Sequence, residues 1–511
     1  MIYESVLEYG WRRNVVTLAV IAATMLEIID TTIVNVALPN IQGNLGVSVD
    51  QAAWVVTGYI IANVVVIPVT PWLQMRFGRR AYYLASILLF TFASAMCGAA
   101  PSFESLVFWR IIQGVGGGGL ISTSQAILRE TYPAKEQGRA QGIFAMGVIV
   151  GPALGPVLGG FITDALTWRW AFYINIPIGI LTAIAVYLVL RNPMAPQKNK
   201  PLDFIGFGLL ATGLGSLQYV LEQGQQHDWL ADPGIRVLSI FSVLALVGFV
   251  LWTLRSKIPI VDLHVLRYRE VAAGSLLGAV LGISLYGSVL ILPQYVQNSL
   301  NFTATMSGQT MLIRALAVML LTPLSAMIAS RRLVDVRIMV FSGFVFLGIA
   351  NWMQAIVTTP QTQFWTLAAS LIVSGMGLSM LFVPLSLAVL GGVQPKDVPA
   401  ASAFFNLARQ IGGSIATAIL VTVLVRQEDV HQTALSSNVS LHAMPVHNYL
   451  LANGGEHAAA ALRSLADFVT QQAYVLSYAD TARLTAVITL VLAPLVMLLR
   501  RPRAGATAAP E

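Results

Sequence analysis

The chain has 511 residues, of which 56% are hydrophobic and only 10% are charged. Because soluble domains carry about a quarter charged residues, this composition excludes an ordinary soluble protein and indicates an integral membrane protein. The single cysteine, Cys97, excludes an intrachain disulfide and any zinc or iron–sulfur site built from several cysteines.

Apolar stretches of about 20 residues recur along the chain, which is the length of a transmembrane helix rather than of a β-barrel strand. The first stretch contains two acids and no small-residue cleavage site, so we expect a retained helix instead of a signal peptide. We therefore predict an all-α membrane protein. Its fourteen expected spans are residues 15–38, 52–73, 81–100, 105–127, 140–162, 170–190, 204–222, 235–254, 271–293, 306–329, 338–357, 364–391, 400–425 and 481–499.

The basic residues are distributed unequally between the two sides of these spans. If the N-terminus is cytoplasmic, 22 of the 30 Lys and Arg residues fall in cytoplasmic segments, five in external segments and three within spans. This bias predicts an even number of helices, with cytoplasmic ends at residues 1–14 and 500–511. It also accounts for the net charge of +7 without a nucleic-acid partner.

Two acids, Glu27 and Asp30, lie inside the first span and share one helix face. An ionised group at that depth costs several kcal/mol unless it faces a bundle interior or a wet cavity, so both are candidates for proton coupling. Arg110 lies at a similar depth in the fourth span, and we expect it to pair with Asp30. A fixed structural ion pair is the alternative for these two residues, and contact with a cationic substrate is the alternative for Glu27.

Two stretches of the chain are alike in their proline and arginine spacing. Pro39 and Pro68 are 29 residues apart, Pro293 and Pro323 are 30 apart, and an Arg follows eight residues after each second proline. Chance recurrence of Gly and Pro in apolar sequence is the alternative to a true repeat. The repeat predicts two six-helix bundles, 15–190 and 271–499, with two inserted helices at 204–254 between them.

Four motifs then carry a resemblance to a known family. They are Leu26-x-x-x-Asp30-Thr31-Thr32 through Pro39, Leu106-x-x-x-Arg110-x-x-Gln113-Gly114, the fifth-span set Gly147, Gly151, Pro152, Gly155, Pro156, Gly159 and Gly160, and Trp168 through Gly179. With these motifs the chain resembles the fourteen-helix drug:proton antiporter family (EmrB/QacA type) of the major facilitator superfamily, and it is most similar to the EmrB branch. The resemblance implies the major facilitator fold, and export driven by the proton gradient without a cofactor or metal.

The resemblance also implies a gating motif in the loop between the second and third spans, with Arg76, Gly78, Arg79 and Arg80. Met75 stands where the family has an acid that latches the cytoplasmic side, which puts this latch in doubt. The fifth-span motif goes with antiport in the family. The candidates for substrate contact are Glu27, Tyr59, Asn63, Gln113, Arg314 and Arg409. For Arg314 and Arg409 the favoured alternative is bonding between helices.

The sequence thus predicts a multi-pass exporter of the bacterial inner membrane, not an enzyme, that exchanges protons for amphipathic organic compounds. Resemblance to the EmrB branch implies a periplasmic adaptor and an outer-membrane channel as partners. Residues 426–480, the external connection before the last span, are the docking candidate, and residues 458–478 have the spacing of an amphipathic helix. Alternatives are proton-coupled uptake, export of one endogenous metabolite such as a siderophore or fatty acid, and a membrane sensor that transports nothing.

Overall fold

A computed structural model of the chain describes residues 7–192, 196–197, 201–300, 302–331, 333–437, 439, 444–452 and 459–499. Every regular element in these residues is a helix, which confirms the predicted all-α class. The predicted tail at 500–511 lies outside the described residues.

The first half of the chain forms nine helices. They are α1 (Gly10–Leu45), α2 (Val49–Val66), α3 (Thr70–Phe77), α4 (Arg79–Gly98), α5 (Phe103–Gly117), α6 (Leu120–Thr131), α7 (Gln137–Ala165), α8 (Trp170–Tyr173) and α9 (Asn175–Val189). The next two, α10 (Phe204–Gln223) and α11 (Pro233–Arg255), correspond to the predicted insertion. The rest are α12 (Arg269–Asn298), α13 (Ala304–Ser330), α14 (Val336–Val357), α15 (Phe364–Gly391), α16 (Val398–Ser437), α17 (Met444–Ala452) and α18 (Ala459–Leu492), and short 3-10 turns η1 (Ile67–Val69) and η6 (Ala493–Leu498) continue α2 and α18.

Several helices begin at polar caps that the sequence supplies at their first turn. The side chains of Ser48, Ser102, Asp203, Asp232 and Thr303 each accept a backbone N–H from the turn that follows. These caps satisfy N–H groups that have no partner within the helix, and they define where α2, α5, α10, α11 and α13 start.

Each of the fourteen predicted spans falls on one or two of these helices. Among the described residues, eleven helical segments are long and apolar enough to cross a membrane. The fourth predicted span is divided between α5 and α6, neither of which reaches that length alone. The count of fourteen transmembrane helices stays a prediction.

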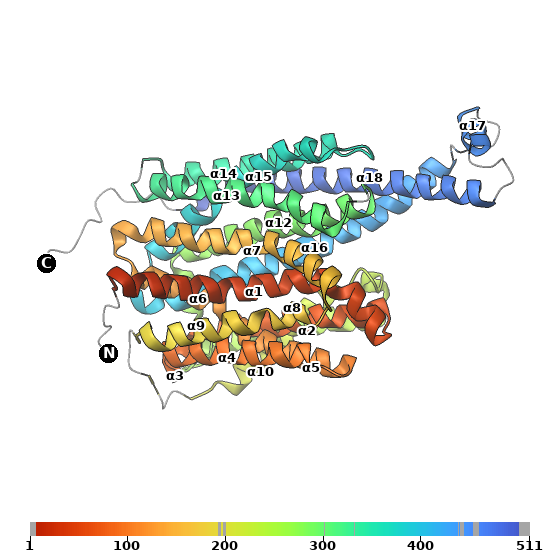
Figure 1. Ribbon diagram of the computed structural model, residues 1–511. Helices are drawn as coiled ribbons and strands as arrows, with labels where there is room; N and C mark the ends of the chain where they lie inside the picture. Colours follow the sequence, from red (N-terminus) through yellow and green to blue (C-terminus); the bar gives the residue numbers. More distant parts are fainter. Residues whose placement is uncertain are drawn as a thin grey trace.

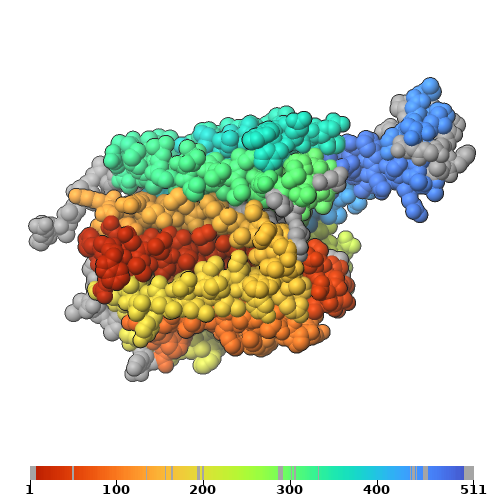
Figure 2. All heavy atoms as spheres, viewed as in Figure 1, coloured from red at the N-terminus to blue at the C-terminus, as the bar shows by residue number. Residues whose placement is uncertain are grey.

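The helices run side by side in one elongated bundle (Figure 1). The N-terminal helices, red to yellow, and the C-terminal helices, green to blue, form two adjoining groups, with α7 at their junction (Figure 2). α16 and α18 continue beyond the other helices and carry α17 at their tip. Most of the predicted external connection is therefore helical, and its expected amphipathic helix is the first part of α18.

Small residues let α7 pack closely against α1. An added Cβ would lie 3.2 Å from Ile21 at Gly147, 2.8 Å from Ile28 at Gly151 and 3.1 Å from Val36 at Gly159. The four-residue spacing of these glycines places them on one face of the helix. The predicted motif is therefore a contact surface for α1, although the side chain of Pro156 lies outside the described residues.

α7 packs against the second half of the chain on its other side. An added Cβ at Gly142 would lie 3.1 Å from the Cβ of Ala326 in α13, and at Gly308 of α13 it would lie 3.1 Å from the Cα of Val157 in α7. α7 thus lies between α1 and α13, so a change in the angle between the two halves requires these close-packed surfaces to slide or separate.

Gly155 allows a test of this packing. An alanine Cβ there would overlap Thr32 Oγ1 and lie 2.6 Å from Thr32 Cβ. We expect Gly155→Ala to lower the stability by about 1–3 kcal/mol, the usual cost of overpacking, measured as a lower thermal midpoint of the detergent-purified protein.

The matched control is Gly208→Ala in α10, because an added Cβ there meets nothing within 4 Å. This variant should unfold at the same temperature as the wild type or higher, since alanine is the better helix former. Equal midpoints for Gly155→Ala and the wild type would contradict the close packing of α1 and α7.

Candidate functional site

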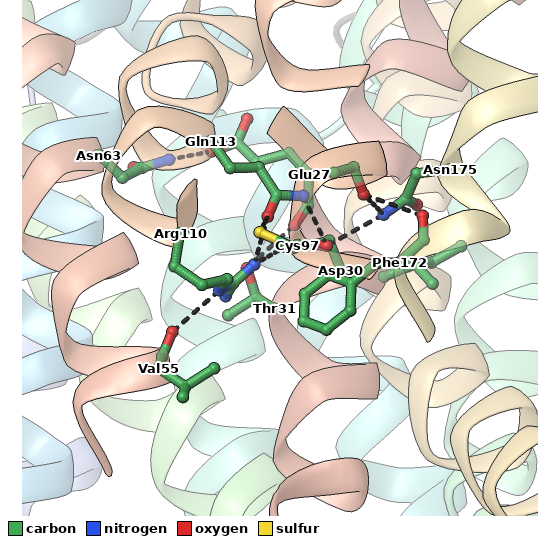
Figure 3. Close-up of polar contacts among 12 residues, drawn as sticks. Glu27, Asp30, Thr31, Val55, Asn63, Cys97, Arg110, Gln113, Phe172 and Asn175 are labelled. Atoms are coloured by element: carbon green, nitrogen blue, oxygen red, sulfur yellow. Dashed lines mark hydrogen bonds and ion pairs between the residues drawn. The ribbon is translucent and has the colours of Figure 1, made fainter. Parts of the chain in front are cut away.

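The centre of the N-terminal half is a buried ion pair between α1 and α5. Arg110 Nη1 lies 2.6 Å from Asp30 Oδ2, and both side chains have no exposed surface. Figure 3 shows the two residues pointing toward each other from facing helices. The predicted contact between Asp30 and Arg110 is therefore present.

Two amides complete the coordination of Asp30. Gln113 Nε2 donates to Asp30 Oδ1 at 2.9 Å, and Asn175 Nδ2 of α9 donates to the same oxygen at 3.0 Å. Gln113 also accepts from Arg110 Nη1 at 2.8 Å. Asp30 thus accepts three hydrogen bonds, all suited to its ionised form, because a carboxylate offers only acceptors.

Further contacts fix the guanidinium of Arg110. Its Nε donates to the carbonyl oxygen of Val55 in α2 at 2.9 Å. The Tyr59 ring lies 4.3 Å from the guanidinium carbon, and the Phe172 ring lies 5.7 Å from it on another helix. Arg110 therefore contacts residues of α1, α2 and α8 from its place in α5. Loss of its ion pair would change the contacts among all four helices.

Glu27 lies one turn away from Asp30 but has different partners. Asn63 Nδ2 donates to Glu27 Oε1 at 2.9 Å, and the backbone N–H of Ile121 donates to Oε2 at 3.2 Å. Glu27 is buried, with 6% of its side chain exposed. Of the predicted substrate contacts, Glu27 and Asn63 are therefore hydrogen-bonded to each other.

The donor from Ile121 is available because the predicted fourth span is interrupted. The run Gly116 to Gly119 ends α5 at Gly117, and α6 starts at Leu120. The first N–H groups of α6 have no acceptor within that helix, and its positive end is directed at the Glu27 carboxylate. The glycines also pack closely, since a Cβ at Gly118 would lie 2.6 Å from the Asn63 carbonyl oxygen.

The other two predicted substrate contacts, Arg314 and Arg409, belong to the C-terminal half. They are buried, with 4% and 2% exposed. Arg409 Nη2 donates to Asn406 Oδ1 at 3.2 Å, and Arg314 lies near Met311 Sδ at 3.5 Å. Residues 271–427 contain only two acids, Asp335 and Asp397, both at helix starts. The structure does not bring these arginines into the Asp30 network.

A polar cluster that the sequence analysis missed joins the two halves. Gln125 of α6 donates to Ser386 at 3.1 Å and accepts from Ser402 at 2.9 Å and from Asn406 at 2.8 Å. All four side chains are buried. Because Asn406 also accepts from Arg409, this cluster connects α6 of the first half with the buried cation of the second.

The predicted gating motif lies at the turn between α3 and α4. Arg79 forms an ion pair with Glu130 of α6, with Nη2 3.1 Å from Oε1, and its Nε donates to Gln74 at 3.1 Å. Gln74 donates in turn to Thr123 at 3.0 Å. These bonds attach the turn to α6 without an acid at position 75.

The other motif residues shape the same turn. Gly78 has φ +86°, a conformation that favours glycine, and it separates α3 from α4. The backbone N–H of Arg80 donates to Asn192 Oδ1 at 2.8 Å, and its guanidinium lies 4.9 Å from the Tyr187 ring. Arg76 lies in the last turn of α3. The gating role of these residues stays a prediction.

Asn175 and two small polar residues are members of the site that the sequence analysis did not single out. Asn175 Nδ2 also lies 3.0 Å from Ser94 Oγ, and Cys97 Sγ lies 3.7 Å from Gln113 Oε1. The available signal was the polarity of Asn175 within an apolar segment. Among the described residues, no group of three or more His, Cys, Asp or Glu side chains is arranged to hold a metal ion.

Two known proteins are similar to this chain in sequence over most of its length. The multidrug export protein EmrB of Haemophilus influenzae is 34% identical over 424 residues, which cover 83% of each chain. The fatty acid resistance protein FarB of Neisseria gonorrhoeae is 32% identical over 497 residues, covering 95% of this chain and 96% of FarB.

A solved structure and a family model also match this chain. The crystal structure of the human organic anion transporter MFSD10 superposes with a TM-score of 0.58 at 14% identity, covering 93% of this chain and 99% of that one, so this likeness concerns the fold alone. The family model described as Major Facilitator Superfamily matches residues 20–417. The chain therefore belongs to the major facilitator superfamily, as its motifs predicted.

Proposed function

We propose that this protein is a proton-coupled multidrug efflux antiporter of the bacterial inner membrane. Membership of a transporter superfamily and similarity to EmrB support a drug efflux transporter. The observation that carries the proton-coupled part is the fully buried Asp30–Arg110 pair with its amide donors. Ionisable groups inside a membrane bundle are characteristic of proton relays.

In this proposal the proton binds to Asp30. A proton on the carboxyl group removes the negative charge that faces Arg110, and the pair loses most of its attraction. Arg110 keeps its bonds to Val55 and the Tyr59 ring, so the change is transmitted to α2. α1 responds through its contact surface with α7, which borders the second half.

The driving force is the proton gradient alone, with no cofactor. One proton that moves down a potential of 100 mV releases about 2.3 kcal/mol, and each pH unit adds about 1.4 kcal/mol. One or two protons per cycle thus sustain at least a tenfold gradient of substrate, which needs about 1.4 kcal/mol. The cargo is an amphipathic organic compound.

Export of one endogenous metabolite is the second candidate function. The similarity to FarB, whose name refers to fatty acid resistance, favours this reading for a carboxylate cargo. A purified protein that releases protons with a fatty acid but with none of several unrelated drugs would establish it in place of multidrug export. If none of the tested compounds causes proton release, the alternative of a membrane sensor that transports nothing is favoured.

We also propose that a periplasmic adaptor, and through it an outer-membrane channel, docks on the hairpin, by which we mean the outer parts of α16 and α18 together with α17 (described residues 426–437, 444–452 and 459–480). α16 and α18 carry this hairpin beyond the bundle (Figure 2). At its base His431 Nε2 lies 2.8 Å from Asp480 Oδ2. Leu462 and Phe468 of α18 are 43% and 48% exposed, which suits contact with another protein.

Asp30→Asn tests the coupling site. We expect no drug-dependent proton release from the detergent-purified variant, because asparagine is neutral at every working pH. Drug-induced proton release, followed with a pH indicator in weakly buffered solution, is the measurement. Glu27→Gln is the parallel variant and shows whether Glu27 shares the coupling.

A double variant separates coupling from structure. Asp30→Asn leaves Arg110 buried without its partner, which is itself destabilising by about 3–5 kcal/mol. In Asp30→Asn/Arg110→Gln neither charge remains, and we expect a thermal midpoint above that of Asp30→Asn but still no proton release. Recovery of proton release in the double variant would assign Asp30 a structural role only.

Shortening the hairpin tests the partner. Residues 434–467 are replaced by a short Gly-Ser linker, which keeps the His431–Asp480 contact and the Gln432–Thr470 hydrogen bond of 3.2 Å. We expect drug transport into inverted vesicles to persist while the cells lose drug resistance.

Leu462→Ser/Phe468→Ser is the milder companion variant, because it keeps both helices and removes two largely exposed apolar side chains, of which Phe468 also contacts the Tyr449 ring of α17. It should also reduce resistance. Full resistance with the shortened hairpin would remove the adaptor from the proposal and leave the transporter assignment unchanged.

A further inference from the structure

The inserted helix α10 lies along the seam between the two halves and bonds to both. Towards α16, Gln218 Nε2 donates to Ser414 Oγ at 2.8 Å, and Trp229, just after α10, donates to Thr422 at 2.9 Å. Towards α2, Gln223 Nε2 donates to Thr57 Oγ1 at 3.2 Å. The polar end of α10 therefore has α2 on one side and α16 on the other.

Glu222 lies between two sets of contacts on α10. Gln218 donates to Ser414 of α16, whereas Gln223 donates to Thr57 of α2 and the Tyr219 ring lies beside Trp54 of α2. A helix turns by about 100° per residue, so these residues form two rows on its surface. Glu222 falls between the rows, four residues after Gln218 and three after Tyr219. Gln218, which bonds to α16, also donates to the Glu222 carboxylate, so this carboxylate adjoins the seam.

Among the residues that the structure describes, no cation pairs with the Glu222 carboxylate. Glu222 is partly buried, and Gln218 Nε2 donates to its Oε1 at 2.9 Å. No Lys, Arg or His of the described chain forms an ion pair with it. A partly desolvated carboxylate held by one amide attracts a positive charge from outside the protein.

An aromatic pair lies about one helix turn from Glu222, on the side of α10 that faces α2. The Tyr219 ring is 5.4 Å from the ring of Trp54, which is 37% exposed. Residues three apart on a helix are neighbours on its surface, so Tyr219 adjoins Glu222. A carboxylate next to Tyr and Trp faces is the chemistry that binds organic cations rather than metal ions.

We propose that Glu222, with Tyr219 and Trp54, forms a site for the positively charged group of an amphipathic organic cation in the seam between α2 and α16. This inference rests on the proposed drug export, because it names a class of cargo for that function. The site is separate from the Asp30 network, which lies among α1, α5 and α9.

Two ions of equal size and opposite charge test the site. The probes are tetraphenylphosphonium and tetraphenylborate, titrated calorimetrically into the full-length protein in detergent. For Glu222→Gln we expect the Kd of tetraphenylphosphonium to rise about tenfold and that of tetraphenylborate to change by less than about twofold, since only one charge interaction is lost. Glu222→Asp keeps the charge and should retain most of the affinity.

Glu104→Gln is the matched control, because Glu104 is an exposed acid in the first turn of α5 and its substitution removes the same charge. It should leave both dissociation constants unchanged. An unchanged Kd of tetraphenylphosphonium in Glu222→Gln, an equal loss for both probes, or no binding of tetraphenylphosphonium by the wild type would each overturn the site.

Proton release in response to neutral drugs is measured on the same preparations. If it persists while Glu222→Gln binds tetraphenylphosphonium like the wild type, the site is wrong and proton-coupled export stands. If neutral drugs and tetraphenylphosphonium release no protons from the wild type, proton-coupled export itself fails.

Discussion

The energetic cost of charge inside a membrane governs the arrangement of the N-terminal half. Asp30 and Arg110 are both without exposed surface, and removal of either leaves the other as an uncompensated charge in a medium of low dielectric constant. The positions of Gln113, Asn175 and the Tyr59 ring follow from this constraint, because the two amides hydrogen-bond to Asp30 and the ring faces the Arg110 guanidinium. Arg110 thus contacts four helices, and in the proposed mechanism a proton on Asp30 weakens its attachment to α1.

The close packing of α7 determines how the first half meets the second half. Its glycines bring it against α1, and its opposite side meets α13 with equally little space. The space at each glycine is filled by a neighbouring side chain, such as Ile28 at Gly151 and Val157 at Gly308, so the helices approach closely and interlock. The interior of the first half is therefore fixed by charge, whereas its boundary with the second half is fixed by close contact between small residues.

The sequence predicted most of the fold and the contact between Asp30 and Arg110. Both predictions depend on the cost of placing polar or charged groups in lipid. Apolar length predicts helices in lipid, and the cost of an isolated buried Arg110 predicts its pairing with Asp30. Asn175 and the Gln125 cluster were not predicted. Burying a neutral amide costs less free energy than burying a charge, and the hydrogen-bond partners of these amides are remote in the chain. The division of the fourth span at Gly117 was also missed, since a glycine run is compatible with both packing and a helix end.

The length of the last helices has a mechanical consequence. α16 is continuous from Val398 to Ser437, and it runs from the Gln125 cluster beside Ser402 to the base of α17 without interruption. At about 1.5 Å per residue it is a rod of some 60 Å. A rod that tilts about its inner end moves most at its outer end, so a rotation too small to notice near Ser402 becomes a displacement of several ångströms at Ser437. The outer end of α16 thus moves in proportion to the angle between the two halves.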